Sequence, residues 1–270
     1  MIAISDREFI LLTEYIYKYC GINLTKKKTL VESRLYGFLM QKGFADFSSF
    51  YDYLLNDESG DVVCAVIDRI STNHTFFMRE IQHFNYFRDQ VLPQVKAAVK
   101  NRDLRIWSAG CSSGEEPYTL AMIIADYFGQ EKKLWDSSIL ATDISSRALN
   151  KAREGIYNDE EISSLPAPWK RRYFRNLGPD QSMVTNKLKE DIVFRKFNLM
   201  DKTFPFKKKF QVIFCRNVMI YFDSTTKQDL IDRFYDCTDK GGYLFIGQSE
   251  SLNRDESKYQ YIMPAVYRKE

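Results

Sequence analysis

The chain has 270 residues and a formal net charge of +3, and 44% of its residues are hydrophobic. This length and composition support a folded core in one large or two modest domains. No apolar run reaches the roughly 18 residues of a membrane-spanning helix, and the start lacks a secretory signal pattern, so we expect a cytoplasmic protein without direct membrane insertion. The five cysteines lack CxxC spacing and only two histidines are present, which argues against a disulfide framework, a metal centre and a Ser-His-Asp triad.

The first part of the chain carries helical patterns. Ser5 and Glu8 match a capping box, which marks the start of a helix, and apolar side chains recur behind it at helical spacing. Further helical segments are expected at residues 31–40, 47–55 and 62–70. We therefore predict an all-α N-terminal domain over residues 1–72.

From about residue 104 the pattern changes to alternating strands and helices. The expected strands are residues 104–109, 138–142, 192–197, 211–215, 243–247 and 261–267, the last suited to an antiparallel edge hairpin, and the expected helices are residues 117–128, 147–153 and 226–237. Such alternation predicts a mainly parallel sheet with helices on both faces. We predict an α/β domain over residues 73–270, with a small antiparallel β element inserted at residues 155–192.

The most informative stretch is the turn at residues 110–120, between an apolar strand and an apolar helix. Such a unit opens nucleotide-binding domains, because a glycine such as Gly110 lets a ligand approach the backbone and the helix start offers free N–H groups. Ser112 replaces the second glycine of the dinucleotide pattern, and Glu115 and Glu116 would repel a pyrophosphate. Carboxylates instead suit an adenosine ligand with a sulfonium charge, such as S-adenosylmethionine. The competing interpretation is an ordinary strand–turn–helix connection.

Two further segments place polar side chains at the ligand-binding edge of such a sheet. Asp143 ends the second strand, where a carboxylate accepts hydrogen bonds from both ribose hydroxyls, although an acidic residue there also suits a helix cap. Asn217 and Tyr221 follow a buried strand, and Asn198 with Leu199 follows the strand before it. We expect Asn198 and Leu199 to flank an adenine ring and Asn217 to bind the ligand; for each of them a role in packing alone is the alternative.

Residues 73–80 join a cation to amide and hydroxyl groups, with aromatic residues between them. Arg79 in such a segment is suited to pairing with a ligand carboxylate through two hydrogen bonds. The residues by themselves favour a helix N-terminus capped by Asn73 or Thr75, with Phe77 in the core. His74 is interpreted as a polar neighbour and not as a base.

Charge is unevenly spread along the chain. Residues 168–209 contain twelve Lys or Arg against four Asp or Glu, a local excess of +8, whereas residues 1–61 sum to −2. A basic segment in a near-neutral protein suggests an acidic partner surface, and the alternative is a solvated face. Signatures of the common nucleic-acid-binding modules are absent from the sequence, so we expect no nucleic-acid partner.

Taken together, these segments resemble the CheR-type chemotaxis receptor glutamate methyltransferases. The matching stretches are residues 72–80, 107–118, 141–144 and 214–222. The strings GEEPY at residues 114–118 and CRNVMIYF at residues 215–222 are highly specific in combination. The similarity extends over nearly the whole chain. One departure is the run Phe76-Phe77-Met78, where the family usually has a double aromatic directly before the arginine.

The resemblance implies a helical N-terminal domain followed by a Rossmann-like class I methyltransferase domain with an inserted β-subdomain. It implies methyl transfer from S-adenosylmethionine to the γ-carboxylate of specific glutamates on the cytoplasmic domain of chemotaxis receptors, in sensory adaptation. The implied cofactor contacts are Asn73, Thr75, Arg79, Gly110, Glu115, Asp143, Asn198, Leu199, Asn217 and Val218, and the implied catalytic residues are Arg79 and Tyr221. Between Glu115 and Glu116, Glu115 is preferred because it lies nearer to Gly114. We expect a monomer.

Two other functions stay open from the residues. One is a methyltransferase of the same fold that acts on another substrate, and the other is a non-catalytic module that binds S-adenosylmethionine as a signal. The strings GEEPY and CRNVMIYF disfavour a methyltransferase with another substrate. The presence of Arg79 and Tyr221 disfavours a non-catalytic module. No general base is expected, because a glutamate carboxylate is already ionised at neutral pH. The compact sequence at residues 174–193 speaks against docking of a receptor's tethering peptide on the β-subdomain.

Overall fold

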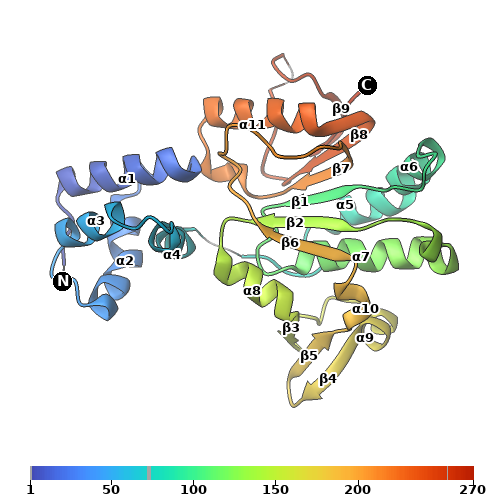
Figure 1. The fold of residues 1–270 in the computed structure, drawn as a ribbon, viewed down its shortest axis with the longest axis horizontal. Helices are drawn as coiled ribbons and strands as arrows, with labels where there is room; N and C mark the ends of the chain where they lie inside the picture. The colour runs from blue at the N-terminus through green and yellow to red at the C-terminus, as the bar shows by residue number, and fades with distance from the viewer. Residues whose placement is uncertain (1, 72–73, 254) are drawn as a thin grey trace.

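The computed structural model describes residues 2–71, 74–253 and 255–270. Figure 1 shows a small helical region on the left and a larger α/β region on the right. The helical region contains α1 (Asp6–Cys20), α2 (Lys28–Lys42), α3 (Phe47–Leu55) and α4 (Asp61–Ile70). These helices confirm the all-α start that the sequence predicts.

The first helix begins at the expected capping box. The Ser5 hydroxyl accepts a hydrogen bond from the backbone N–H of Glu8, and the Glu8 carboxylate accepts one from the backbone N–H of Ser5. These bonds satisfy two N–H groups that would otherwise lack partners at a helix start. The apolar stripe of α1 then joins a core shared by the four helices, which includes the fully buried Ile16, Val31 and Phe50.

The α/β region is built on a seven-stranded sheet with the order β6-β2-β1-β7-β8-β10-β9. Its strands are β1 (Ile106–Ala109), β2 (Ile139–Asp143), β6 (Ile192–Lys196), β7 (Phe210–Cys215), β8 (Thr238–Ile246), β9 (Gln260–Met263) and β10 (Val266–Arg268). Neighbouring strands are parallel except that β10 is antiparallel to both β8 and β9. The mainly parallel sheet and its antiparallel edge hairpin are therefore confirmed.

Helices cover both faces of this sheet. One face carries α5 (Ile81–Tyr86), the π-helical turn η1 (Phe87–Val91), α6 (Leu92–Ala98), α7 (Glu115–Phe128) and α8 (Ser146–Glu154), and the other carries α11 (Ser224–Cys237). Successive residues of a strand point to opposite faces, so Ile106 belongs to the first core and Trp107 to the second. The helices at residues 81–98 are not predicted from the sequence, because α5 and α6 have only six and seven residues and such short segments show little periodicity.

A second sheet forms the predicted insertion. It is antiparallel, with the order β3-β5-β4, and consists of β3 (Ile156–Asn158), β4 (Phe174–Gly178) and β5 (Gln181–Val184). Together with α9 (Ala167–Tyr173) and α10 (Asn186–Lys189) it projects below the main sheet in Figure 1. The Tyr157 hydroxyl donates a hydrogen bond to the Ser113 carbonyl, 2.6 Å away, so this small sheet is tied to the turn after β1.

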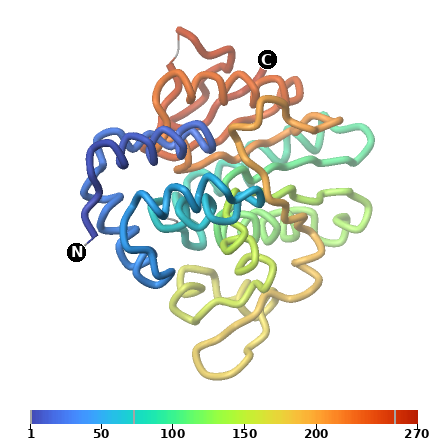
Figure 2. The backbone as a smooth tube through the Cα atoms, turned by 60° about the vertical axis from the view of Figure 1, so that its left-hand side comes forward, coloured from blue at the N-terminus to red at the C-terminus, as the bar shows by residue number. Residues whose placement is uncertain are grey.

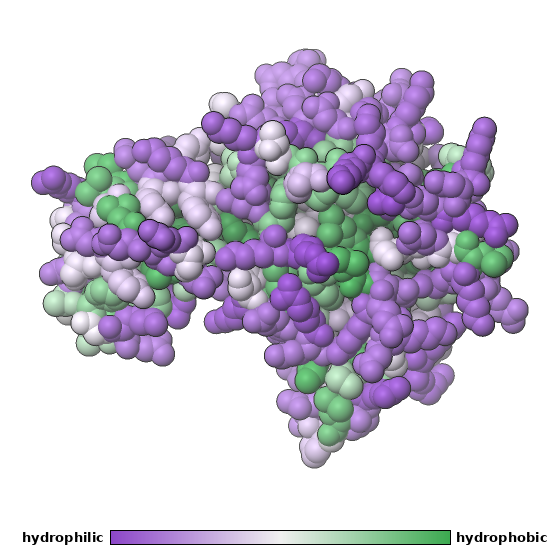
Figure 3. Space-filling model, viewed as in Figure 1, coloured by the Kyte–Doolittle hydropathy of each residue, from purple (hydrophilic) through white to green (hydrophobic). Residues whose placement is uncertain are grey.

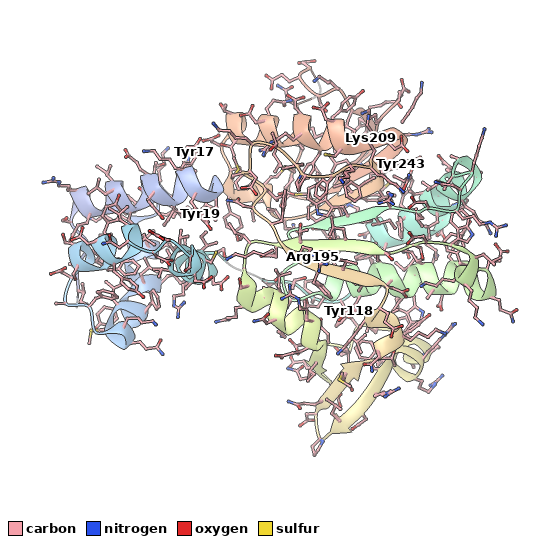
Figure 4. The ribbon with its side chains drawn as sticks, viewed as in Figure 1. Tyr17, Tyr19, Tyr118, Arg195, Lys209 and Tyr243 are labelled. Carbon is pink, nitrogen blue, oxygen red and sulfur yellow. The ribbon has the colours of Figure 1, made fainter. Side chains whose placement is uncertain are left out.

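The helical region contacts the α/β region where α1 ends. Figures 1 and 2 both show this end of α1 beside the start of α11, and Figure 4 places Tyr19 on it. The Asn198 side-chain amide donates to the Tyr19 carbonyl at 2.6 Å, and the Asn23 N–H donates to the Tyr221 carbonyl at 2.9 Å. Two residues that the sequence assigns to the site are thus held by the helical region.

Hydrophilic residues cover most of the face of the molecule shown in Figure 3. In the described part of the chain, none of the helices combines the length and the apolar character that crossing a bilayer requires.

Thr142 offers a test of the sheet interior. Its buried hydroxyl accepts a hydrogen bond from the Trp107 indole N–H at 2.9 Å. Thr142→Val keeps the side-chain shape but leaves that buried donor unsatisfied, so we expect the free energy of unfolding to fall by about 1–3 kcal/mol in urea denaturation. Thr203→Val, at an exposed position, is the matched control, with an expected change within about 0.5 kcal/mol. Equal losses in the two variants would contradict the role of the hydrogen bond.

Candidate active site

A cavity of about 440 Å³ lies at the carboxyl ends of β1, β2 and β7. At this point the strand order reverses, because the chain runs from β1 through β2 to β6 on one side and from β7 to β8 on the other. Ligands of open α/β sheets bind at such a switch point. Cys20, Ile22 and Ile67 line the cavity from the helical region, so both regions enclose it.

Most of the site residues predicted from the sequence line this cavity. They are Thr75, Arg79, Gly110, Asp143, Asn198, Leu199, Asn217, Val218 and Tyr221. These residues come from five separate segments of the chain, which the fold brings together. Asn73 lies outside the described residues, and Glu115 is not among the residues that line the cavity.

The turn after β1 brings the backbone to the cavity. Gly110 has a φ of 79°, and a Cβ atom there would lie 2.4 Å from a methyl carbon of Val218, so only glycine fits. Ser112 also lines the cavity, and its side-chain oxygen is buried and has no hydrogen-bond partner among the described residues. A buried hydroxyl without a partner is destabilising, which marks this position for a polar group of a ligand.

Asp143 ends β2 and is anchored by two backbone groups. Its Oδ2 accepts a hydrogen bond from the Ser112 N–H at 2.8 Å, and its Oδ1 accepts one from the Ser145 N–H at 2.9 Å. Burial raises the pKa of Asp143, and these hydrogen bonds oppose the rise. A carboxylate has about four acceptor positions, so these bonds leave acceptor capacity for a ribose hydroxyl. The N-cap of α8 is Ser145, which excludes the alternative interpretation of Asp143 as the cap residue.

The two glutamates at the start of α7 face different surroundings. Glu116 lines the cavity and accepts a hydrogen bond from the Ser108 hydroxyl at 2.7 Å. Glu115 is buried, and its carboxylate accepts hydrogen bonds from the Ser113 hydroxyl at 2.8 Å. Successive residues of a helix point about 100° apart, and proximity to Gly114 along the chain does not determine which of them faces the ligand. Of the two glutamates, Glu116 and not the preferred Glu115 is the one that lines the cavity.

Arg216 is a buried cation at the centre of the site that the sequence analysis did not single out. One guanidinium nitrogen donates to Glu116 Oε2 and the other to Glu80 Oε2, each at 3.0 Å, and the second nitrogen also donates to the Arg79 carbonyl. The guanidinium carbon lies 5.1 Å from the centre of the Phe84 ring. A buried charge requires such partners. Its position directly after a buried strand was the signal that could have identified it.

Glu80 joins three segments of the chain. Its carboxylate accepts hydrogen bonds from Arg216, from the Asn217 side-chain amide at 3.2 Å and from the Gln248 N–H at 3.2 Å. Burial by itself would raise the pKa of Glu80, but the charge and hydrogen bonds of Arg216 outweigh it, with help from Asn217, and the pKa is lowered. Glu80 is therefore ionised at neutral pH and connects the segment before α5 to the loop after β7.

Four non-glycine residues in the segments around the cavity have positive φ angles. They are Met78 (62°), Glu80 (56°), Ser112 (49°) and Asn217 (58°). Such conformations cost about 1–3 kcal/mol each and persist only where the surroundings enforce them. Here the hydrogen bonds of Glu80 and a bond from the Asn217 N–H to the Glu250 carboxylate at 3.0 Å provide that enforcement. The backbone of the site is therefore held in one conformation.

The segment before α5 forms turns and not the helix start that its residues favour. α5 begins at Ile81, and its N-cap is Glu80, so Thr75 does not cap this helix. Phe77 is fully buried, as expected. The Arg79 guanidinium lines the cavity and donates to the His74 carbonyl at 2.5 Å. No carboxylate of the described residues forms an ion pair with Arg79, so its charge is available to a ligand.

The order of the strands, together with the Asp143 carboxylate at the switch point, is typical of a nucleoside-binding domain of Rossmann-like architecture. The sequence matches the family profile described as the SAM-binding domain of CheR methyltransferases over residues 73–267, and the profile of their all-alpha domain over residues 7–71. The chain belongs to the CheR methyltransferase family, whose members use S-adenosylmethionine.

Characterised relatives agree with this assignment. The chain is 45% identical over 272 residues to the chemotaxis protein methyltransferase of Borreliella burgdorferi, covering 99% of this chain and 96% of the relative. It is 36% identical over 270 residues to the chemotaxis protein methyltransferase of Escherichia coli, covering 98% and 92%. It is 35% identical over 264 residues to chemotaxis protein methyltransferase 1 of Pseudomonas aeruginosa, covering 96% and 95%. The family resemblance stated from the sequence is therefore confirmed.

The chemistry of the cavity fits S-adenosylmethionine. Asp143 retains acceptor positions that suit a ribose, and Arg79 presents a cation that suits the carboxylate of an amino acid. The Glu116 carboxylate supplies negative charge near a sulfonium, and the Ser112 hydroxyl is a further polar position. These groups match the three parts of the cofactor, namely nucleoside, sulfonium and amino acid.

The two glutamates of α7 provide the next test. Glu116→Gln removes a charge that faces the cavity, so we expect the Kd for S-adenosylmethionine to rise about tenfold in isothermal titration calorimetry. Glu115→Gln is the matched control on the same turn, and we expect its Kd to stay within about threefold of the unaltered protein. A larger rise in Kd for Glu115→Gln than for Glu116→Gln would identify Glu115 as the ligand contact.

His83 lies behind the site and is almost completely buried. Its Nδ1 is 3.3 Å from Glu80 Oε2, and its ring packs edge to face on Phe245. Burial lowers the pKa of His83 to about 4; the charge of Arg216 adds to the decrease, while Glu80 opposes it. His83 is therefore a neutral side chain of the folded protein at neutral pH.

This histidine predicts a pH dependence of stability. An unfolded chain binds a proton at this residue below about pH 6.5, whereas the folded chain does so only below about 4. The contribution of neutral His83 is therefore complete above pH 6.5 and is lost as the pH falls toward 4, at no more than about 1.4 kcal/mol per pH unit. In urea denaturation between pH 7 and 4.5, we expect His83→Gln to flatten this slope. His74→Gln, at the exposed histidine, should leave it intact, and an unchanged slope in His83→Gln would refute the prediction.

Proposed function

We propose that this protein transfers a methyl group from S-adenosylmethionine to the γ-carboxylate of specific glutamates on the cytoplasmic domain of chemotaxis receptors. The observation that carries the proposal is that Arg79 and Tyr221 line the same cavity as Asp143, the carboxylate suited to bind ribose hydroxyls. The relatives named as chemotaxis protein methyltransferases cover nearly the whole chain, which supports the choice of substrate. The family's activity serves sensory adaptation, and we propose that role for this chain.

Each cofactor-facing segment has a distinct proposed role. Asp143 accepts hydrogen bonds from the ribose hydroxyls, and Leu199 packs against the adenine. The Asn198 side chain already donates to the Tyr19 carbonyl and accepts from the Met200 N–H, so it fixes the loop that carries Leu199. The remaining proposed contacts are Thr75, Gly110, Glu116, Asn217 and Val218, which all line the cavity.

The reaction needs no general base. The substrate carboxylate is ionised at neutral pH and is itself the nucleophile. When bound, S-adenosylmethionine supplies an electrophilic methyl group, whose bond to sulfur breaks with the electron pair left on sulfur while a carboxylate oxygen bonds the methyl carbon. Opposite charges disappear in this step, so water around the reactants opposes it. Ile22, Ile67 and Ile220 are apolar lining residues that exclude water from the site.

Arg79 and Tyr221 are the proposed catalytic residues. The Arg79 guanidinium orients a carboxylate through paired hydrogen bonds, and the Tyr221 hydroxyl donates a hydrogen bond to the incoming oxygen. Both backbones are anchored, since the Arg79 carbonyl accepts from Arg216 and the Tyr221 carbonyl accepts from Asn23. These anchored side chains align the carboxylate oxygen with the methyl carbon and the sulfur, and this alignment lowers the barrier to methyl transfer.

The basic residues within 168–209 are the proposed docking surface for the acidic receptor. Most of its Lys and Arg side chains are exposed, and Figure 4 places Arg195 on β6 and Lys209 near α11. Part of this charge is neutralised locally, because Lys208 pairs with Asp103 at 2.9 Å and Arg172 pairs with Asp126 at 2.9 Å. We propose that the protein acts as a monomer in the cytoplasm.

The decisive experiment is mass spectrometry of receptor fragments after incubation with the protein and labelled S-adenosylmethionine. We expect a gain of one methyl group on specific glutamates, as an ester that alkali releases. Label on a small molecule or on RNA, or cofactor binding without any transfer, would contradict the proposal. Those outcomes correspond to the two alternative functions that the sequence left open.

Arg79 provides a test of the catalytic site. Arg79→Ala removes the group that orients a carboxylate, so we expect kcat/KM for receptor methylation to fall by about a hundredfold or more, with an unchanged circular dichroism spectrum. Arg79→Lys keeps the charge but loses the paired hydrogen bonds, so its activity should be intermediate. Arg88→Ala, at an exposed position on η1 outside the cavity and outside the basic stretch, is the matched control. Full activity of Arg79→Ala would remove Arg79 from the mechanism.

A further inference from the structure

The helical region presents a single charged residue to the cavity. The residues of this region that line the cavity are Cys20, Ile22, Ile67, Asp68 and Ser71, so among the described residues only Asp68 carries a charge there. Asp68 lies on α4 next to the apolar Ile67. A carboxylate in such a wall is unfavourable unless it finds a donor.

One oxygen of Asp68 lacks such a donor in the part of the chain that the structure describes. Its Oδ1 is shielded from solvent and has no hydrogen-bond partner among the described residues. Leaving a buried acceptor unsatisfied carries the full desolvation penalty. Among the described residues that line this cavity, three side-chain atoms are buried without a hydrogen-bond partner, namely this oxygen, the Ser112 hydroxyl and the Arg216 Nε, and the Asp68 oxygen is the carboxylate acceptor of the three. Because Asp68 also lines a cavity built for a polar ligand, the geometry indicates that its donor belongs to that ligand.

The position of Asp68 relates it to the nucleoside end of the cavity. Burial is the main cause of the raised pKa of Asp143, and the negative charge of Asp68 adds to the rise. The two carboxylates are therefore close enough to influence each other from different regions of the protein. A ligand that offers hydroxyl or amine donors between them relieves the unfavourable proximity, and a nucleoside has such donors on its ribose and on its base.

We propose that Asp68 is a cofactor-binding residue contributed by the helical region. Its Oδ1 accepts a hydrogen bond from the nucleoside half of S-adenosylmethionine, beside the ribose assigned to Asp143. This inference rests on the proposed placement of the cofactor and extends it, because it gives α4 a direct part in binding. Two hydrogen bonds, from the Asn198 side-chain amide to the Tyr19 carbonyl and from the Asn23 N–H to the Tyr221 carbonyl, hold the helical region against the sheet edge and so keep this wall in place.

Calorimetric titration with S-adenosylmethionine and with S-adenosylhomocysteine tests the proposal. Both compounds share the nucleoside, and only the first carries the sulfonium charge. We expect Asp68→Ala to raise the Kd for both compounds about tenfold, because a hydrogen bond to a charged acceptor is lost. Asp68→Asn keeps an acceptor oxygen without the charge, so it should raise both Kd values about threefold. Asp52→Ala, at an exposed position of the same region, is the matched control and should leave both unchanged.

Three results would overturn the inference. Kd values within about twofold of the unaltered protein in both variants would remove Asp68 from the site. A loss confined to S-adenosylmethionine would assign Asp68 to the sulfonium charge and not to the nucleoside. If Asp68→Ala does not fold, Asp68→Asn decides alone, and equal binding by that variant counts against the proposal. Failure of the unaltered protein to bind either compound would instead contradict the proposed function itself.

Discussion

The buried ion network around Arg216 is the interaction on which the rest of the site depends. One guanidinium holds Glu116 at the start of α7, Glu80 before α5 and the Arg79 carbonyl, and Arg216 itself follows β7. The Arg216 side chain therefore joins its own segment to two others that are distant in the sequence. Removing one partner of a buried ion pair leaves an uncompensated charge, at about 3–5 kcal/mol. The network fixes the position of these segments at the cavity, because Arg79, Glu116 and Arg216 all line it.

This network also explains the strained backbone around the cavity. Glu80 and Asn217 have positive φ angles, and both take part in hydrogen bonds that the network organises. Strain of this kind is retained at functional sites because it presents groups in a geometry that relaxed backbone does not offer. Methyl transfer between fixed partners gains most from such rigidity, since its chemistry needs alignment and exclusion of water more than acid or base catalysis.

The helical region forms part of the wall of the candidate active site. The end of α1 anchors Tyr221 and Asn198 through backbone groups, and α4 supplies apolar wall and the Asp68 carboxylate. A sheet edge alone leaves a nucleoside open to water on one side. Closing that side with a second region gives a drier site and places any receptor that contacts the helices close to the methyl group.

The sequence by itself determined most of the helices and strands, and most of the site residues that it predicts line the cavity. Local energetics and motif chemistry can be recognised in a sequence alone. They account for the capping box at Ser5, the alternating strands and the segments around Gly110, Asp143 and Asn217. Those motifs were sufficient to indicate the fold, the cofactor and the family. The short helices at residues 81–98 are not predicted from the sequence, because segments of this length show too little periodicity.

Only the tertiary structure decided which side chains face the cavity. Glu115 and Glu116 are neighbours of the same type, and the rotation of α7 against the sheet turns Glu116 to the cavity and buries Glu115. Arg216 gains its significance from partners that lie 100 and 136 residues away in the sequence. Asp68 gains its significance from an oxygen that has no partner among the described residues. Orientation and long-range pairing follow from packing of the whole chain, and a local pattern carries no information about them.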